Sequence, residues 1–584
     1  MVRESRATGA DVDEVLQRRN ALRAQHIEDS REVVEEYADA ARAVRENGSP
    51  EDRLRAWAAL EDVNRLGSGR PLDRREFLKN AARAAAAVAA ASAGGATVLA
   101  AAGPAAAAAA PRVAIVGGGL AGLRVAQKLW TERGIRSTVY EANPEIGGRV
   151  ETLRGFFDGG QIAEMHGEFI NTEHTSVKAL AARYGLGLDD LYATPNGTVD
   201  SFWINGGRYT EEDITKDWKA FGYDTFHSTV LGVQAPQTYA NHNAAAAAID
   251  AQDAQTWLTN NLPGGSSTRL YQLALESLRG EQGVPSDTSA LVMVYLWSYN
   301  NSARSNHSYQ SNSFLSTAGG DERWHVTGGN DQLVSGMVGE LPAGTIQLST
   351  AVLAVKRNSD GTYTLTINSG GGRNTSVVAD HVVLAAPFSS LRANVDLSKA
   401  GLSAVKLNAI KNLGMSTHGK VLLQFDGHPW YANGFDGNML VDSPTNWMWE
   451  QNFQAGNNTA PYGILLQYPS GPTTQSYVST YGCTKHEGVA PAALVSQVLA
   501  PVNTFYGPGV KEAYHGKAWY HFGLNDPWVR GGYPFWRVGQ VTGFSGIEGV
   551  QEGGIHFAGD ACAWDFQGFM EGALRSAERV TSEI

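Results

Sequence analysis

The pattern of apolar and polar positions changes near residue 112, where a continuous apolar run begins. Val113 to Val116 are all apolar, which predicts a strand buried on both faces, as in a parallel sheet. A helical pattern then extends to Leu129, and Ser137 to Tyr140 predict a second strand. A strand, a turn, a helix and a second strand in this order indicate a Rossmann-like α/β unit.

The first 110 residues have a different pattern. Residues 1–72 are rich in arginine, glutamate and alanine with sparse apolar positions, which predicts an exposed helical N-terminal extension. Residues 73–110 start with Arg74 and Arg75, continue as an alanine-rich stretch and resemble a twin-arginine export signal. The resemblance implies a protein exported to the periplasm or the medium. The long sequence ahead of the arginines departs from the usual short leading region.

Two other interpretations of the alanine-rich stretch are a membrane anchor and a flexible linker. Alanine contributes little to membrane insertion, and Gly94, Gly95 and Pro104 interrupt the run. We therefore expect no stable membrane span in the mature protein.

A glycine-rich turn joins the first predicted strand to the helix. Gly117, Gly119 and Gly122 form the pattern G-x-G-x-x-G. In this context the three glycines permit the turn, the approach of a pyrophosphate and close helix–strand packing, with phosphate at the helix N-terminus. Glu141 ends the second strand about 20 residues further on, where a partner of a ribose hydroxyl is expected. The segment therefore predicts a dinucleotide site.

The residues after this acid indicate which dinucleotide binds. Residues 143–149 read Asn-Pro-Glu-Ile-Gly-Gly-Arg and follow Glu141 almost directly. Here the chain resembles the flavin amine oxidase family, which includes monoamine oxidases, polyamine oxidases and L-amino-acid oxidases. The resemblance implies FAD as the cofactor, with Gly148 and Arg149 beside its phosphates.

Further segments resemble the family in the same order. Residues 163–169 resemble the loop beside the isoalloxazine, and residues 326–333 resemble the second glycine turn. Val352 stands where a family valine brackets the adenine. Residues 555–573 resemble the closing FAD motif, in which Asp560 would meet the ribityl–phosphate region. The resemblance covers essentially residues 111–584.

The resemblance also implies two interleaved domains behind the N-terminal extension. A Rossmann-like FAD-binding domain would be assembled from residues 111–190, 322–400 and 527–584. An α+β substrate-binding domain would come from residues 191–321 and 401–526.

Three residues align with family positions close to the flavin. Lys420 enters an apolar strand and resembles the lysine that holds a water against flavin N5. Phe569 aligns with one wall of the aromatic cage around the amine, and Tyr533, or its neighbour Phe535, with the other wall. Some members carry a flavin-linked cysteine where this chain has Tyr533, so we expect non-covalent FAD. The alternatives are structural: a strand-edge lysine, and helix packing by Phe569.

His166 and Glu168 lie in the loop beside the isoalloxazine, and we expect them to bind substrate. L-Amino-acid oxidases often place an arginine there to pair with the substrate carboxylate, and this loop has none. Glu168 facing the pocket would favour a cationic amine, whereas Glu168 bonded to the backbone would never meet the substrate. Arg323 or Arg537 would be alternative sources of a carboxylate-binding arginine.

Composition adds exclusions. The formal net charge is -12 without a basic stripe, which argues against nucleic-acid binding. Cys483 and Cys562 offer neither a disulfide framework nor metal-ligand spacing, so we predict no metal site, and a single disulfide stays open. The oligomeric state is also open, a homodimer included.

The sequence thus predicts an FAD-dependent oxidase that converts a primary or secondary amine to an imine, then an aldehyde, and reduces O2 to H2O2. The alternative is an L-amino-acid oxidase that produces a 2-oxo acid, ammonia and H2O2. A dehydrogenase that uses another electron acceptor is a third possibility. The presence of Lys420 and Phe569 argues against a flavin-binding protein without catalysis.

Overall fold

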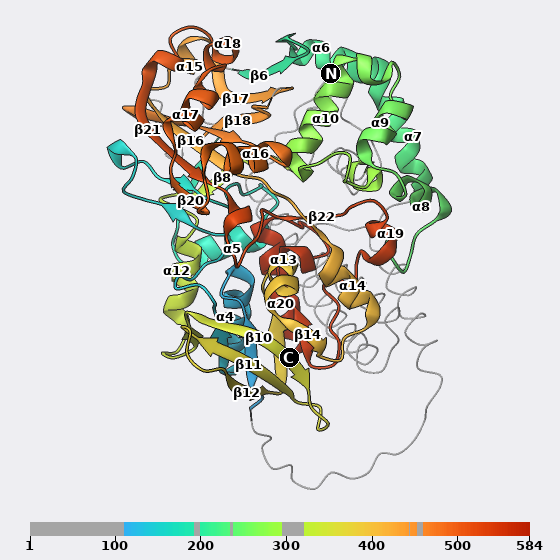
Figure 1. Cartoon of the computed structure of the whole chain (residues 1–584), viewed down its shortest axis with the longest axis vertical. Coiled ribbons are helices and arrows are strands. Elements are labelled where there is room, and N and C mark those ends of the chain that lie inside the picture. The colour runs from blue at the N-terminus through green and yellow to red at the C-terminus, as the bar shows by residue number, and fades with distance from the viewer. Residues whose placement is uncertain (1–109, 192–198, 234–237, 295–319, 443, 452–459) are drawn as a thin grey trace, which may run out of the picture. The chain divides into compact units, whose positions relative to one another are not determined.

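The protein divides into two units, Met1–Ala108 and Ala109–Ile584, and the structure describes residues of the second unit only. The computed structural model (Figure 1) describes residues 110–191, 199–233, 238–294, 320–442, 444–451 and 460–584. The predicted helical extension, 1–72, and nearly all of the predicted export signal, 73–110, lie outside the described residues.

A five-stranded parallel sheet lies in the lower half of the view in Figure 1 and is built entirely from described residues. Two helices, α4 (Leu120–Arg133) and α20 (Met570–Glu583), share a core with it that includes Ile115, Val125 and Val580. Buried apolar strands of this kind are typical of sheets covered by helices. In spatial order the strands are β23 (Ile555–Phe557), β13 (His381–Leu384), β1 (Val113–Val116), β2 (Ser137–Tyr140) and β9 (Ile346–Gln347).

A smaller sheet lies below it in the same view. Tyr363, Leu365 and Ile367 alternate with more exposed residues, so one face of the sheet is buried. Its four strands in the described chain are β12 (Thr375–Ala379), β11 (Tyr363–Ser369), β10 (Thr350–Arg357) and β14 (Asp396–Lys399).

A mixed sheet occupies the upper half of the view. Its strand β16 is buried from Lys420 to Phe425 because helices cover its apolar side chains. Among the described residues the sheet has eight strands: β20 (Glu487–Val489), β21 (Tyr514–His521), β16 (Lys420–Asp426), β19 (Tyr462–Tyr468), β18 (Trp447–Glu450), β17 (Phe435–Val441), β6 (Val199–Ile204) and β7 (Gly207–Arg208).

Two groups of helices accompany the mixed sheet. One group shares a core with β16 and consists of α15 (Pro429–Ala432), α16 (Pro472–Tyr481), α17 (Ala492–Leu499) and α18 (Val502–Tyr506). The other packs against Phe202 of β6 and Leu440 of β17. Around that second core lie α6 (Glu211–Asp217), α7 (Tyr223–Val233), α8 (Ala244–Asp250), α9 (Ala254–Asn261) and α10 (Arg269–Gln282).

Short strand pairs and helices complete the described chain. The pairs are β3 (Thr152–Leu153) with β4 (Ala163–Glu164), β5 (Leu188–Asp190) with β8 (Trp324–Val326), and β15 (Gly414–Met415) with β22 (Pro534–Phe535). The helices are α5 (Thr175–Arg183), α12 (Gln332–Glu340), α13 (Phe388–Asn394), α14 (Ala404–Asn412) and α19 (Gln540–Phe544).

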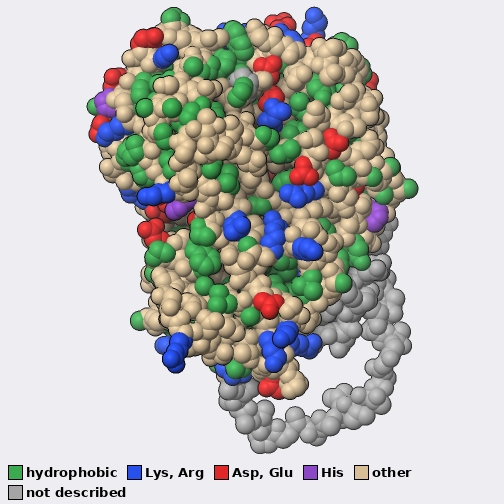
Figure 2. All heavy atoms as spheres, viewed as in Figure 1, with side chains coloured by type: hydrophobic (Ala, Val, Ile, Leu, Met, Phe, Trp, Pro, Cys, Tyr) green, Lys and Arg blue, Asp and Glu red, His purple; other side chains and the backbone are tan. Residues whose placement is uncertain are grey.

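The expected α/β class, with a Rossmann-like sheet and a second mixed sheet, is confirmed. The exact domain boundaries stay a prediction. Cys483 and Cys562 are both buried and free, so they do not form the disulfide that the sequence left open. None of the described helices is both long and apolar enough to cross a membrane. Figure 2 shows acidic and basic side chains interspersed on the visible face.

We expect Gly122→Ala to destabilise the protein, because a Cβ there would lie 2.1 Å from the carbonyl oxygen of Gly117. Overpacking of this kind typically costs about 1–3 kcal/mol. Gly543→Ala in α19 is the control, since a Cβ there meets no atom within 4 Å. It should be neutral or stabilise by up to about 1 kcal/mol. Thermal unfolding compares the two, and equal midpoints would show that the close approach at Gly122 is unimportant.

Candidate functional site

The glycine turn between β1 and α4 has the shape of a phosphate cradle. At Gly119 a Cβ would meet only the carbonyl oxygen of Gly147, at 3.8 Å, so the backbone is open to a close approach there. Helix α4 also begins at Gly119 without a side-chain cap, which leaves the N–H groups of its first turn for an anion. The turn therefore fits the pyrophosphate of a dinucleotide.

The second glycine segment packs directly against this turn. The Gly147 amide donates to the carbonyl of Gly118 at 3.1 Å. Gly148 has a φ of 59°, and a Cβ there would lie 3.2 Å from the Cα of Gly119. The two glycine segments that the sequence singled out separately thus lie side by side.

Arg149 and Asp560 form a bidentate ion pair at the edge of the cradle. The guanidinium donates to the two carboxylate oxygens at 2.8 and 2.6 Å and to the carbonyl of Gly532 at 2.9 Å. Such fork-to-fork pairs fix both geometry and charge. The pair joins the segment predicted beside the phosphates to the closing motif predicted beside the ribityl chain.

Glu141 lies at the end of β2, next to the glycine turn. Its carboxylate accepts hydrogen bonds from the amides of Gly118 at 2.6 Å and Asn143 at 2.7 Å, and burial raises its pKa. Each oxygen retains a lone pair for a further donor such as a ribose hydroxyl. The Thr350 amide donates to the Glu141 carbonyl at 2.8 Å, which brings the start of β10 and the buried Val352 to the same region.

Lys420, at the start of β16, holds the loop of residues 163–169. Its ammonium donates to the carbonyls of Glu164 at 2.8 Å and His166 at 3.1 Å, and to the Glu168 carboxylate at 2.6 Å. An ammonium has three donors, and protein acceptors use all of them here. This geometry differs from the expected lysine that holds a water, because no donor is left for one.

Glu168 is fully engaged inside the protein. Besides Lys420, its carboxylate accepts hydrogen bonds from Trp449 Nε1 at 2.7 Å and Gln451 Nε2 at 2.6 Å. The side chain is only 4% exposed. Glu168 therefore does not present a free carboxylate to a cationic substrate, as one interpretation of the sequence expected, because Lys420 already neutralises its charge.

Asn330 holds the same loop through further hydrogen bonds, a role that was not predicted from its place in the second glycine turn. Its side-chain amide donates to the carbonyls of Gly167 at 3.1 Å and Glu168 at 2.7 Å. Its backbone amide donates to the Glu164 carboxylate at 2.9 Å. The sequence feature that could have indicated this role is a short polar side chain directly after two glycines.

Tyr533 belongs to a row of aromatic rings that ends at the loop. Its ring stacks on His418 with a centroid distance of 4.8 Å, and His418 stacks on Tyr468 at 4.7 Å. Trp449 lies 4.9 Å from Tyr468 and 5.6 Å from Phe169. The rings form a continuous aromatic row, and burial raises the pKa of Tyr468 and Tyr533.

The other predicted aromatic residues lie apart from this row. Phe569 immediately precedes α20 and packs edge-on against His174, with ring centroids 5.3 Å apart. Gly568 beside it approaches Tyr533, since a Cβ there would lie 3.6 Å from the Tyr533 side chain. Phe535 is buried in the β15–β22 pair.

Two carboxyl groups that the sequence did not single out lie around the row. Glu281 follows Gly280, whose carbonyl accepts a 3.1 Å hydrogen bond from the Tyr533 hydroxyl. Burial raises the pKa of Glu281 to about 7, and burial together with the charge of Glu281 raises that of Glu322 to about 8. Both carboxyls also act on Tyr468 and Tyr533. Among the described residues, neither carboxyl has a hydrogen-bond or ion-pair partner.

Both arginines considered as carboxylate binders are already paired. Arg323 donates to Asp190 at 2.9 and 2.6 Å and lies over the ring of Trp324. Arg537 pairs with Asp287 at 3.0 Å. The His166 ring meets that of His521 edge-on, with ring centroids 4.2 Å apart.

Comparison with known proteins places this geometry in a known context. A family model described as flavin containing amine oxidoreductase matches residues 120–584. An L-amino-acid oxidase of Siganus canaliculatus is 25% identical over 486 residues, which cover 81% of this chain and 85% of that protein. A flavin-containing amine oxidase of Danio rerio is 23% identical over 485 residues, with coverage of 81% and 85%.

Solved structures share the fold. A cyclohexylamine oxidase from Brevibacterium oxydans superimposes with a TM-score of 0.67 at 20% identity. The match covers 81% of this chain and 98% of that chain, so nearly the whole of that structure shares the fold.

We expect Lys420→Met to destabilise the protein by about 3–5 kcal/mol, because it leaves the Glu168 carboxylate buried without its cation. Glu168→Gln should also destabilise it, and the double variant should lose clearly less than the sum of the single losses. Chemical denaturation measures these differences. Lys128→Met is the control, since Lys128 pairs with Glu132 on an exposed helix face and should matter by less than about 1 kcal/mol. Additive effects of the two buried replacements would contradict the pair.

Proposed function

The chain belongs to the flavin-containing amine oxidoreductases, and we propose that it is an oxidase that converts an amine to an imine with reduction of O2 to H2O2. Its relatives include proteins named amine oxidase and L-amino-acid oxidase, so the substrate class must come from the site itself. We favour an amine without an α-carboxylate, and one that carries a second positive charge.

The distribution of charge carries this proposal. Two acids without a partner among the described residues, Glu281 and Glu322, lie beside the aromatic row, whereas Arg323 and Arg537 are neutralised by their own aspartates. An amino-acid carboxylate would be repelled by these acids and would find neither arginine free. A second ammonium group on the substrate would instead be attracted by them.

The residues around the aromatic row also suit the chemistry. When bound, the flavin supplies the acceptor for the hydride equivalent that leaves the carbon next to the amine nitrogen. The amine must react in its neutral form, and the apolar rings of His418, Tyr468 and Tyr533 disfavour the ammonium by excluding water. Lys420 acts as a positioning residue, because it fixes the loop of residues 163–169 through three hydrogen bonds.

We further propose that the cofactor is FAD held without a covalent bond. Tyr533 occupies the position of the family's flavin-linked cysteine, its ring is stacked on His418, and both cysteines are buried elsewhere. Acid precipitation of the yellow holoprotein should leave the flavin in the supernatant, where its mass identifies FAD. Flavin that stays with the precipitated chain would contradict this proposal.

A peroxide-release screen of purified holoprotein tests the activity. We expect peroxide with amines, the highest kcat/KM with diamines, and weak turnover of L-amino acids. Absence of peroxide with fast dye reduction would identify a dehydrogenase. Preference for L-amino acids would establish the alternative oxidase, and absence of both signals would overturn the activity altogether.

Variants of the two acids test the substrate class. Glu281→Gln and Glu322→Gln should each lower kcat/KM for a diamine roughly tenfold, since a charged hydrogen bond contributes about 1.5–3 kcal/mol, and leave an alkyl monoamine of equal length little changed. The preference for the diamine should grow as pH rises from 6 to 9, because the two carboxyls lose their protons near pH 7 and 8. Equal losses for both substrates would contradict a charge-specific role.

A further inference from the structure

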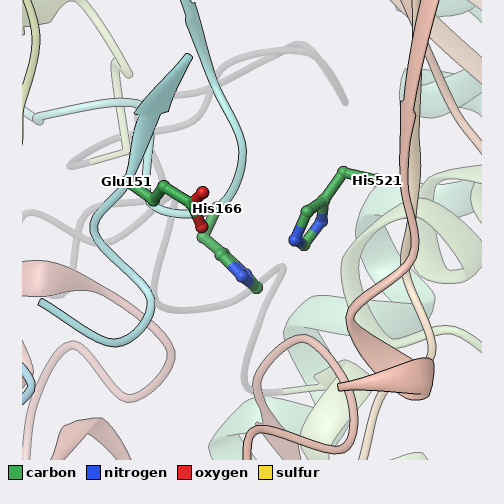
Figure 3. A group of neighbouring side chains, drawn as sticks. All are labelled: Glu151, His166 and His521. Carbon is green, nitrogen blue, oxygen red and sulfur yellow. The ribbon is translucent and has the colours of Figure 1, made fainter. Parts of the chain in front are cut away.

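Three titratable side chains that the proposed reaction does not use converge on one point, and one of them is His166, which the sequence predicted to bind substrate. Glu151 lies just before β3, His166 just after β4, and His521 at the end of β21. A carboxylate oxygen and one ring nitrogen from each histidine lie within 4.8 Å of one another. Figure 3 shows the carboxylate of Glu151 and the two rings pointing into a common space.

The backbone brings these side chains together from both halves of the described chain. The Met165 amide donates to the Glu151 carbonyl at 2.9 Å just beyond the β3–β4 pair, so Glu151 is opposite Met165 and lies close to the next residue, His166. His521 is opposite Lys420 in the mixed sheet, and Lys420 donates to the His166 carbonyl. The convergence is therefore fixed by strand pairing and by a hydrogen bond to the loop.

The polar atoms at this point lack partners. His521 is 2% exposed, and its Nε2 has no hydrogen-bond partner in the part of the chain that the structure describes. Among the described residues, no side chain bonds to the carboxylate of Glu151 or to the ring of His166. A buried polar atom without a partner costs free energy, and in native proteins it usually indicates a bound water or ion.

The protonation states suit a cation. Burial lowers the pKa of His166 well below its usual value and that of His521 to about 3, so both rings are neutral and offer a lone pair. A neutral imidazole is the form that binds metals. Burial, together with Glu487 and Asp526, raises the pKa of Glu151 to about 8, so this carboxyl is largely protonated at neutral pH and must release its proton when it binds a cation.

The positively charged side chains nearby do not cancel the negative charge around Glu151, His166 and His521. Lys420 and Arg149 both act on the histidines, but each has its own carboxylate, Glu168 at 2.6 Å and Asp560 at 2.6 Å. The remaining neighbour, His486, lies 6.2 Å from His521 between ring centroids. The excess charge around the three ligands is therefore negative.

We propose that Glu151, His166 and His521 bind a divalent first-row transition-metal ion, such as Zn²⁺, with one carboxylate and two imidazole ligands. Two histidines and one carboxylate form a common ligand set for zinc and for other ions of this series, with positions left for water. Ligand bonds of about 2.0–2.2 Å require the three atoms to approach within about 3.5 Å of one another.

This metal would join the β3–β4 region of the cofactor half to β21 of the mixed sheet. It would lie beside the loop that Lys420 holds, and its role does not depend on which amine is oxidised. The proposed amine oxidation does not use the side chain of any of these three residues.

Metal content and Zn²⁺ titration of the purified holoprotein test the site. After chelator treatment and gel filtration with the flavin retained, we expect calorimetry to show one Zn²⁺ per chain and thermal unfolding to shift upward with Zn²⁺. Glu151→Gln and His521→Gln should each weaken binding at least tenfold and abolish that shift. His486→Gln is the matched control, because it removes a neighbouring histidine that is not a ligand, and it should bind as the parent protein does.

The contrary results are equally distinct. Failure of the parent holoprotein to bind Zn²⁺ stoichiometrically would overturn the site, as would equal binding by the Glu151 and His521 variants. Binding by flavin-free protein alone would show that the three residues belong to the flavin site and would also overturn it. Flavin content and circular dichroism of each variant separate loss of the site from loss of the fold, and amine turnover is not needed for any of these outcomes.

Discussion

The buried ion pair between Lys420 and Glu168 is the interaction on which the arrangement of the site depends. Both side chains are 4% exposed, and taking two charges out of water is tolerated only where further hydrogen bonds satisfy them. Trp449 and Gln451 donate further hydrogen bonds to the Glu168 carboxylate. The carbonyls of Glu164 and His166 accept the remaining hydrogen bonds of the Lys420 ammonium. Because the lysine belongs to the mixed sheet and the glutamate to the cofactor-side loop, the pair fixes one half against the other.

A second buried network holds the same loop from behind. The Glu164 carboxylate accepts hydrogen bonds from Thr152, from the Asn330 amide and from His325. Burial opposes the charge on His325, but hydrogen bonds to Asp189 and Glu164 outweigh it, and its pKa is raised. His325 Nε2 lies 2.8 Å from an oxygen of Glu164, and both side chains are fully buried. Lys420 and Asn330 donate hydrogen bonds to the carbonyls of residues 163–169 and so fix the backbone of this loop. The fixed backbone determines where the His166 ring lies.

The parts of this site that are local in sequence could be predicted, and the parts that depend on distant contacts could not. Gly117 to Gly122 and Glu141 lie within one strand–turn–helix–strand unit, where spacing alone dictates geometry. Glu168 was ambiguous because its partners, Lys420, Trp449 and Gln451, are about 250 residues or more away in the sequence. The meeting of Glu151 with His521 was equally hidden, since a ligand set drawn from three segments has no characteristic spacing. The paired states of Arg323 and Arg537 likewise required the fold.

The acids beside the aromatic row resolve a conflict inherent in amine oxidation. A site that attracts an ammonium group must also deliver a neutral amine. An alkylammonium has a pKa near 10.4, so transfer of its proton to an ordinary glutamate, near 4.3, costs about 8 kcal/mol. Transfer to Glu281 or Glu322, with pKa values of about 7 and 8, costs only about 3–5 kcal/mol. For the amine substrate that we propose, the burial that raises these two pKa values lets the same carboxyls attract the cation and accept its proton. A surface carboxylate with an ordinary pKa would attract the cation but would not readily accept its proton.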